Sequence, residues 1–295
     1  MNIALLPNLT RKYAGETTAD ICRWLQQYGA NYAALPETAR LLTGVPELGV
    51  MEFDDLISWC DAIVAVGGDG SMLMAAKKTV DYHKPLLCIN AGRVAFMAGL
   101  ERDELPLLKE LIDGNYRLDK RMLVKCTLLR DGEPLMETEC INDAVLARGR
   151  ELHMSDINVE CDGRLINCYH ADGIIVATPT GSSAYSLSAG GPVIDPGIDA
   201  IVVTPICPQS LLSRPIVFNS NSKIEIYIDE NSNNPRDLYL SCDGAESIPV
   251  RTGDRIIIEK SEKYSEFIRI KNDSFFDILN NKFASSEVTG REVTT

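Results

Sequence analysis

The chain has 295 residues, 45% of them hydrophobic, which is enough for a sizeable core, and its length predicts two domains. A formal charge of −13 argues against nonspecific binding to nucleic acid or to an anionic membrane, so any bound phosphate needs a local site. Pro7 interrupts the first apolar run and no long uncharged apolar stretch follows, so we expect a cytoplasmic protein. Nine scattered cysteines favour reduced thiols over a disulfide framework or a zinc site.

The first hundred residues alternate strand-like and helix-like segments. A helix is predicted around Ile21 and Tyr28, with Thr17 or Thr18 as its cap and Gly29 as its stop. Alternation of this kind implies an α/β domain with a largely parallel sheet. The expected strands are 3–6, 31–35, 62–66 and 85–90, and two further helices are expected from residue 71 and over 101–114.

The pattern changes near residue 117. Asp131-Gly132 and Asp162-Gly163 each separate two strand-like runs and predict β-hairpins. The fold class we predict is an N-terminal α/β domain followed by an all-β domain that is mostly antiparallel. Further strands are expected at 223–228, 237–242, 255–260 and 267–272, and the domains at 1–116, 117–272 and 273–295, the last a helix that returns to the first domain and a tail that is loose from residue 285.

The stretch VGGDGSML, residues 66–73, places three glycines and one carboxylate between a buried strand and a helix. A strand-to-helix loop presents free backbone N–H groups, and glycine lets a phosphate approach the chain closely. Asp69 would repel a phosphate, so it indicates an intervening magnesium ion or a hydroxyl whose proton must be removed. The spacing fits neither a Walker loop nor the dinucleotide fingerprint. The structural alternative is a turn in which Asp69 caps the helix.

A second polar run, HADGIIVATPTGSSAYSLSAGGPV, spans residues 170–193. A strand at 174–177 is followed by Ser182 or Ser183, either of which can cap a short helix. Hydroxyls, N–H groups and the Tyr185 ring at one helix start suit a neutral, planar ligand such as a nucleoside. The alternative is a serine-rich turn with Tyr185 in the core.

A third segment, INDAVLARG at 141–149, places Asn142 and Asp143 after a half-buried strand. A polar pair in that position is rarely left without hydrogen bonds. Because Asn and Asp favour turns, a plain turn is the alternative.

In this order, the three segments resemble the NAD kinase family, enzymes that phosphorylate NAD on its adenosine ribose to make NADP. The resemblance implies an α/β domain followed by a β domain whose chain end returns to the first. It is carried by GGDGSML at 67–73, Asn142-Asp143, residues 171–193 and SRPIV at 213–217, with INAG at 89–92 and CDG at 242–244 as weaker support.

The resemblance also implies a role for each matching residue. Asp69 would accept the proton of the 2′-hydroxyl, and Asn142 and Asp143 would hold NAD through hydrogen bonds. The phosphate loop would consist of Gly67, Gly68 and Gly70, and the other NAD contacts of Asp69, Gly70, His170, Asp172, Ser183, Ala184, Tyr185, Ser186, Leu187 and Ser188. Mg²⁺ would arrive with ATP, with no metal site fixed by the protein alone. NAD and ATP would be the partners, without nucleic acid or membrane, in a homodimer or homotetramer formed through the β domain.

Four positions depart from the family pattern. Asp143 stands where Glu is common, Ser183 where Thr is usual, Ala95 where a loop glycine is usual, and Ala245 where a polar residue often follows the Asp-Gly pair. None of them changes Asp69 itself, so we expect them to bear on substrate affinity and NAD preference.

Two other interpretations stay open. A lipid or sugar kinase shares the Gly-Gly-Asp-Gly loop, but a basic patch or amphipathic anchor is not evident and the cluster at 180–188 fits a nucleoside. An NAD-binding sensor without catalysis would keep the pocket, although the intact Asp69 argues against it. The sequence leaves open whether the donor is ATP, another triphosphate or polyphosphate, and whether NADH is accepted.

Overall fold

The computed structural model describes residues 1–295 except 43, 46, 93–94, 151–152, 229–237 and 281–295. The chain forms two compact units: unit 1 holds Met1–Lys120 and the chain from Ser265 onward, and unit 2 holds Arg121–Tyr264. The chain passes from one unit to the other inside two long strands, β6 (Arg117–Arg130) and β17 (Arg255–Arg269), rather than at the expected domain boundaries near 116 and 272.

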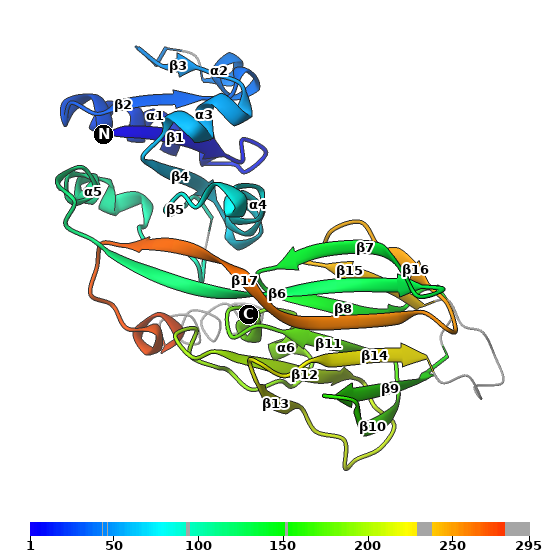
Figure 1. Ribbon diagram of the computed structural model, residues 1–295. Helices are drawn as coiled ribbons and strands as arrows, with labels where there is room; N and C mark the ends of the chain where they lie inside the picture. Colours follow the sequence, from blue (N-terminus) through cyan, green and yellow to red (C-terminus); the bar gives the residue numbers. More distant parts are fainter. Residues whose placement is uncertain (43, 46, 93–94, 151–152, 229–237, 281–295) are drawn as a thin grey trace, which may run out of the picture. The chain divides into compact units, whose positions relative to one another are not determined.

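Unit 1 is built on a parallel sheet with strand order β3-β2-β1-β4-β5 (Figure 1). The chain leaves β1 toward β2, yet β4 lies on the other side of β1, so the order reverses between β1 and β4. In open α/β sheets, ligands bind beyond the carboxyl ends of the strands at such a reversal. The strands are β1 (Asn2–Pro7), β2 (Asn31–Ala34), β3 (Gly49–Val50), β4 (Ala62–Gly67) and β5 (Leu86–Asn90).

The helices of unit 1 differ from expectation in two places. Thr17 and Thr18 do not cap a helix: they lie inside α1, where their hydroxyls donate to carbonyls one turn back. The expected helix over 101–114 consists of two segments, the 3-10 helix η2 and the α-helix α5, which meet between Leu107 and Leu108; Pro106, inside η2, has no N–H to donate. The helices are α1 (Ala14–Gln27), α2 (Pro36–Leu41), α3 (Phe53–Trp59), α4 (Asp69–Thr79), η1 (Val80–Tyr82), η2 (Arg102–Leu107) and α5 (Leu108–Asp113), of which α1 and α5 pack on one buried face of the sheet.

Unit 2 contains two largely antiparallel sheets. In one, β10, β9, β14 and β17 are successive neighbours and β6 pairs with β17 and β7; the other has the order β13-β12-β11-β8-β15-β16. Buried side chains from both sheets form one continuous core between them. The other bounds are β7 (Glu133–Cys140), β8 (Asp143–Arg148), β9 (Ser155–Cys161), β10 (Arg164–Ala171), β11 (Gly173–Ala177), η3 (Gly181–Ser183), α6 (Tyr185–Ser188), β12 (Ala200–Ile206), β13 (Ile216–Asn219), β14 (Ile224–Ile228), β15 (Leu238–Cys242) and β16 (Ile248–Val250).

The fold class is confirmed: a parallel α/β unit and an antiparallel β unit. Both Asp-Gly hairpins are present, joining β6 to β7 and β9 to β10. In each turn both residues have positive φ, as the turns that match strand twist require. The runs 255–260 and 267–272, expected as separate strands, belong largely to the single strand β17, which ends at Arg269.

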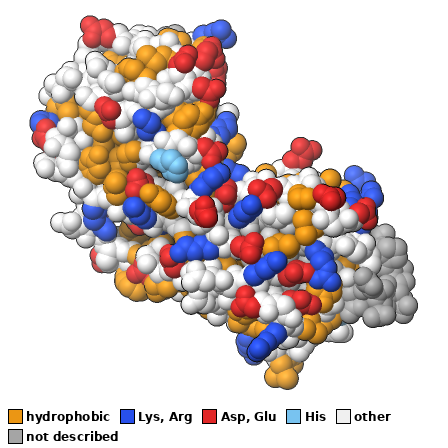
Figure 2. Space-filling view, in the orientation of Figure 1, with side chains coloured by type: hydrophobic (Ala, Val, Ile, Leu, Met, Phe, Trp, Pro, Cys, Tyr) orange, Lys and Arg blue, Asp and Glu red, His pale blue; other side chains and the backbone are white. Residues whose placement is uncertain are grey.

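The chain returns to unit 1 through the end of β17, where Phe267 pairs with Leu86 in parallel register. Residues 275–280 are helical, while the rest of the expected C-terminal helix and the tail from 285 lie outside the described residues. Within the described ranges, no helix is long and apolar enough to cross a membrane. Acidic and basic side chains are interspersed over the face drawn in Figure 2.

Candidate active site

Asp69 is the first residue of α4, directly after the loop that leaves β4. Its carboxylate does not cap the helix, because Oδ2 accepts the N–H of Phe96 at 2.9 Å and Oδ1 accepts that of Met97 at 2.8 Å. The capping alternative is therefore wrong for Asp69. A carboxylate has about four acceptor sites, so these two bonds orient the group and leave capacity for a further hydrogen bond.

The glycines around Asp69 have different surroundings. A Cβ on Gly67 would lie 2.6 Å from the Cβ of Ser71, so only glycine fits at the end of β4. For Gly68 and Gly70, a Cβ would meet nothing within 4 Å. The backbone at Gly68 and Gly70 therefore borders open space, which a phosphate needs if it is to approach N–H groups at a helix start.

A cavity of about 500 Å³ opens beside this loop in unit 1. It lies at the carboxyl ends of β1 and β2 and along α4, on the β2 side of the reversal between β1 and β4. The Asn8 amide donates to the Ser71 hydroxyl at 2.9 Å and so ties the end of β1 to the first turn of α4. The lining is mainly apolar with a few polar groups: Leu6, Pro7, Asn8, Leu9, Thr10, Leu35, Glu37, Thr38, Leu41, Phe53, Ser71, Met74, Ala75 and Lys78.

In unit 2, Ile141 and Asn142 lie between β7 and β8, and two residues satisfy all four of their backbone polar groups. The Asp243 carboxylate accepts the N–H of Ile141 at 2.9 Å and that of Asn142 at 2.8 Å. Thr178 supplies the other two bonds: its hydroxyl donates to the Ile141 carbonyl, and its N–H donates to the Asn142 carbonyl at 2.8 Å. The segment 141–143 is thus held by two other parts of the chain, which a plain turn would not need.

Asp143 is the first residue of β8 and is only 6% exposed. Its N–H donates to Asp243 at 3.2 Å, and its carbonyl accepts the Asp243 N–H at 2.9 Å. Burial, the charge of Asp243 and the Cys242 side chain raise the pKa of Asp143 from 3.8 to about 7. Among the described residues its carboxyl group makes no side-chain hydrogen bond, an arrangement that marks a group available to a ligand.

The segment after β11 packs tightly on Asn142. A Cβ on Gly181 would lie 2.0 Å from the Asn142 carbonyl oxygen, so glycine is required there. Ser182 and Ser183 do not cap the following helix as expected, because their hydroxyls donate back to Pro179 and Thr180. These hydrogen bonds, each spanning three residues, stabilise the turn at 179–183.

The expected adenosine-contact residues have different exposures. Ser186 is fully buried and its hydroxyl lies 2.9 Å from that of Thr204, so this side chain is committed to the interior. Tyr185 is 46% exposed, which excludes the alternative that its ring belongs to the core. Of the others, Ser188 is exposed, and Ser183, Ala184 and Leu187 are half-buried.

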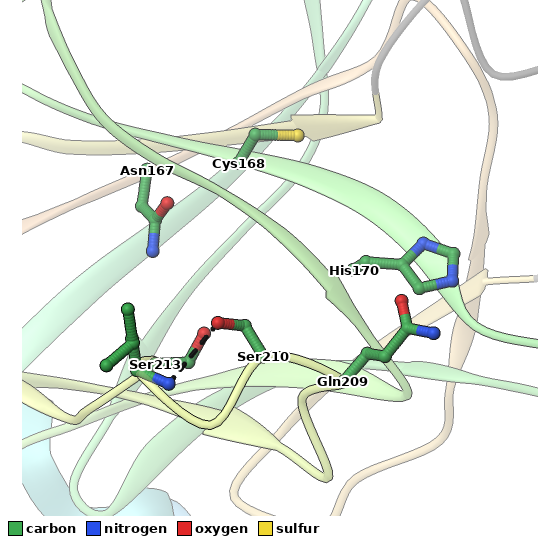
Figure 3. A pocket seen from close by; sticks show the side chains of 7 residues that line it. Asn167, Cys168, His170, Gln209, Ser210 and Ser213 are labelled. Atoms are coloured by element: carbon green, nitrogen blue, oxygen red, sulfur yellow. Dashed lines mark hydrogen bonds between the residues drawn. The ribbon is translucent and has the colours of Figure 1, made fainter.

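Asp172 and His170 lie at the other end of β11 from Thr178. The Asp172 carboxylate pairs with Arg148 at 2.8 Å, and Nδ1 of His170 lies 2.6 Å from Asp156. The expected NAD contacts in unit 2 therefore form two groups, one at each end of the strand. His170 also borders the cavity of about 340 Å³ shown in Figure 3, lined by Asn167, Cys168, His170, Gln209, Ser210, Leu212 and Ser213.

The chain matches the ATP-NAD kinase N-terminal domain over residues 50–116 and the ATP-NAD kinase C-terminal domain over residues 141–270. It belongs to the NAD kinase family. A protein of Desulforamulus reducens named NAD kinase is 35% identical, with 95% of this chain and 96% of that protein covered. A NAD kinase of Caldanaerobacter subterraneus is 34% identical, with coverages of 95% and 98%.

Solved structures of NAD kinase family members have the same fold. The yeast NADH kinase in complex with NADH superposes with a TM-score of 0.83 and 26% identity, covering 95% of this chain and 86% of that one. The Archaeoglobus fulgidus NAD kinase in complex with ATP gives a TM-score of 0.74 and 25% identity, covering 97% and 99%. The chain is therefore a member of a kinase family across nearly its whole length.

Three further residues of this NAD kinase family member, Asp243, Thr178 and Arg121, were given no role from the sequence, although Asp243 and Thr178 lie in segments that carry the resemblance. Asp243 belongs to an Asp-Gly pair, a dipeptide that also serves in ordinary hairpins, and Thr178 stands within the polar run. Arg121 is 7% exposed and donates to the Thr180 hydroxyl at 3.3 Å. No local pattern marks Arg121, because its contact spans 59 residues of sequence.

Proposed function

We propose that this chain transfers the terminal phosphoryl group of ATP to the 2′-hydroxyl of the adenosine ribose of NAD, giving NADP, with Asp69 as the general base. The observation that carries the proposal is the Asp69 carboxylate, oriented by two backbone N–H groups and flanked by Gly68 and Gly70, which border open space. Membership of the NAD kinase family supports the acceptor and the donor. Phosphoryl transfer depends mainly on positioning and charge neutralisation, which one base and a ring of N–H groups can provide.

NAD would be held in unit 2 by the Asn142-Asp143 pair and the segment 183–188. The buried Asp143 carboxyl and the half-buried Asn142 amide fit the hydroxyls of a ribose, since both make directional hydrogen bonds. Tyr185 presents an exposed ring on which an adenine could stack. Asp172 and His170, at the far end of β11, would reach the nicotinamide half.

The donor would occupy the 500 Å³ cavity at the carboxyl ends of β1 and β2, where Ser71 next to the phosphate loop is part of the lining. Its apolar lining, including Phe53 and Met74, suits a planar base, and the exposed Lys78 suits the charge of phosphates. This lining favours a nucleoside triphosphate over polyphosphate, which has no apolar part to bury.

Magnesium would be carried by the donor phosphates. Among the described residues no group of three or more His, Cys, Asp or Glu side chains could hold a metal ion. Magnesium is often bound through substrate phosphates with one or two carboxylates, and Asp69 keeps free acceptor sites for that role. When bound, the ion neutralises charge that builds on the transferred group.

The activity is tested by mixing the purified chain with Mg²⁺, ATP and NAD and detecting NADP with a dehydrogenase specific for that product. Parallel reactions replace NAD with NADH, ATP with polyphosphate, or add a chelator. NADP formation that requires ATP and is lost on chelation supports the proposal. Binding of NAD without NADP formation would instead support the sensor interpretation.

The donor cavity is tested separately with Met74→Trp, a change at a residue that is 59% exposed and lines the cavity. We expect the KM for ATP to rise by about fivefold or more while the Kd for NAD stays constant, because roughly 1 kcal/mol of donor binding would be lost. The matched control is Leu107→Trp, which adds the same ring at a 36% exposed position of unit 1 outside the cavity.

We further propose a cytoplasmic homodimer or homotetramer assembled through unit 2. Leu211 and Leu212 of unit 2 are 87% and 88% exposed, and Leu165 of β10 is 59% exposed. Large apolar side chains exposed to this degree are common on contact surfaces between subunits. Light scattering on the eluting protein gives its mass, and Leu212→Glu should reduce that mass. A wild-type monomer would contradict this proposal.

A further inference from the structure

Three Asp-Gly pairs in unit 2 share one backbone conformation but not one set of contacts. Asp131, Asp162 and Asp243 have φ values of 54°, 51° and 53°, each followed by a glycine with positive φ. The first two belong to the hairpins between neighbouring strands. Asp243 differs because its carboxylate binds backbone about a hundred residues earlier in the chain, at Ile141 and Asn142.

The segment 141–143 depends on these contacts for its shape. Its N–H groups point at the Asp243 carboxylate, and the carbonyls of Ile141 and Asn142 point at Thr178, so the backbone is held from the end of β15 on one side and from the end of β11 on the other. Thr178 is fully buried, so water cannot replace its hydroxyl without rearrangement. A buried N–H or C=O that loses its partner is costly, which keeps both residues in place.

The side chains of Asn142 and Asp143 have the opposite character. Among the described residues, neither makes a side-chain hydrogen bond. The segment therefore combines a backbone that is fully bonded with two polar side chains that are not. This combination is typical of a ligand-binding group held rigid by its support.

We propose that Asp243 and Thr178 are positioning residues for NAD, which fix the backbone of 141–143 so that the Asn142 and Asp143 side chains are presented to the nucleotide. This inference rests on the proposed function and extends it to two residues that would not touch the ligand themselves. The negative charge of Asp243 has a second effect, because it helps to raise the pKa of the neighbouring Asp143 carboxyl.

The first test is Asp243→Asn. The amide has one acceptor oxygen fewer and turns an N–H toward backbone N–H donors, so the segment should lose its fixed geometry. We expect the Kd for NAD, measured by calorimetry, to rise about tenfold or more, equivalent to roughly 1.4 kcal/mol. The kcat at saturating NAD should fall by less than about threefold, because Asp243 supports binding of ground state and transition state alike.

A matched control comes from the second hairpin. Asp162→Asn makes the same change at an Asp-Gly pair of the same conformation, where the carboxylate accepts the Lys223 N–H at 2.9 Å. Asparagine tolerates this left-handed backbone, so neither variant is strained. The Kd for NAD of Asp162→Asn should stay at the wild-type value.

The pH profile separates positioning from general structural support. The charged or titratable groups acting on Asp143 are Asp243 and Cys242, both on or next to β15. Removing the Asp243 charge favours the ionised form of Asp143 and lowers its pKa. The pH dependence of NAD affinity should therefore have its midpoint near the Asp143 pKa of about 7 in the wild type, and at lower pH in Asp243→Asn.

A second pair of variants keeps the inference testable if Asp243→Asn does not fold. Thr178→Val preserves shape but removes the hydroxyl that binds the Ile141 carbonyl, whereas Thr178→Ser keeps the hydroxyl and removes a methyl group. We expect weakened NAD binding in Thr178→Val and near wild-type binding in Thr178→Ser. Equal Kd values for both, or a wild-type Kd and pH midpoint in Asp243→Asn, would overturn the inference. A wild-type protein that fails to bind NAD would overturn the proposed function, and this inference with it.

Discussion

Gly181→Ala should damage unit 2 through a steric overlap that can be calculated from the structure. The added Cβ would lie 2.0 Å from the Asn142 carbonyl oxygen, 2.5 Å from its carbon and 2.7 Å from Cα. All three are backbone atoms, so no flexible side chain can move aside. Gly181 does not have a positive φ, so the alanine backbone is unstrained and the effect comes from overlap alone.

Relief of the overlap requires a backbone shift. Cβ contacts below 3.0 Å essentially never occur, so Gly181 and Asn142 must separate by about 1 Å or more. That shift breaks or weakens the bond from the Thr178 N–H to the Asn142 carbonyl, now 2.8 Å long. Overpacking costs typically ~1–3 kcal/mol and a lost hydrogen bond about 1 kcal/mol, so we expect unfolding free energy to fall by roughly 2–4 kcal/mol.

Urea unfolding followed by far-ultraviolet circular dichroism measures this loss. Tryptophan fluorescence gives an internal control, because both tryptophans, Trp24 and Trp59, belong to unit 1. The matched variant is Gly15→Ala in α1, where the nearest atom to the new Cβ is 3.9 Å away; it should stabilise by up to about 1 kcal/mol. A Gly181→Ala protein with wild-type stability and wild-type NAD affinity would refute the reasoning.

Three other changes have defined outcomes. Asp69→Asn should lower kcat by about 10²–10⁴-fold with the melting temperature almost unchanged, and full activity in a coupled NADP assay would exclude Asp69 as the base. Asp143→Asn should stabilise the fold at alkaline pH. The pKa of Asp143 in the folded protein, about 7, lies above its ordinary value of 3.8, so the wild type loses stability as the pH rises from 4 to 7. The loss in unfolding free energy is at most roughly 4 kcal/mol. Urea titrations at pH 4 and pH 8 should show no gain at the first pH and the full gain at the second. Arg130→Met should lower the free energy of unfolding, because Arg130 binds the buried Asp254 carboxylate at 2.7 Å and 3.0 Å, and a loss within experimental error would show that the pair is not needed.

Many elements of the fold could be predicted from local sequence. The apolar run at 62–66 became β4, and the Asp-Gly pairs at 131 and 162 became hairpins, because each signal lies within a few neighbouring residues. Predictions were wrong where a residue's local preference was outweighed by another local hydrogen bond. Thr17 and Thr18 are good capping residues, but the helix began earlier and their hydroxyls found carbonyls one turn back.

The residues of the candidate site could be proposed from the sequence, but their surroundings could not. The glycine loop and the Asn142-Asp143 pair were chosen from residue type, order and family resemblance, and their roles stay predictions. The sequence did not reveal that Ser186 bonds Thr204 inside unit 2, or that Asp172 and Thr178 lie at opposite ends of β11. Asp172 and Thr178 are close in sequence, but the extended strand between them holds them apart by its own length.

The amino acid order alone determined the kind of elements, the two-unit architecture and a set of polar residues suited to a nucleotide. Tertiary structure decided what each polar group does. The Asp69 carboxylate is held by Phe96 and Met97 across 27 and 28 residues, and the Asn142 N–H is bound by Asp243 across 101 residues. Such bonds form only when the folded core brings distant segments together and excludes the water that would otherwise satisfy them. The orientation of Asp69 and the raised pKa of Asp143 therefore belong to the fold rather than to any local stretch of sequence.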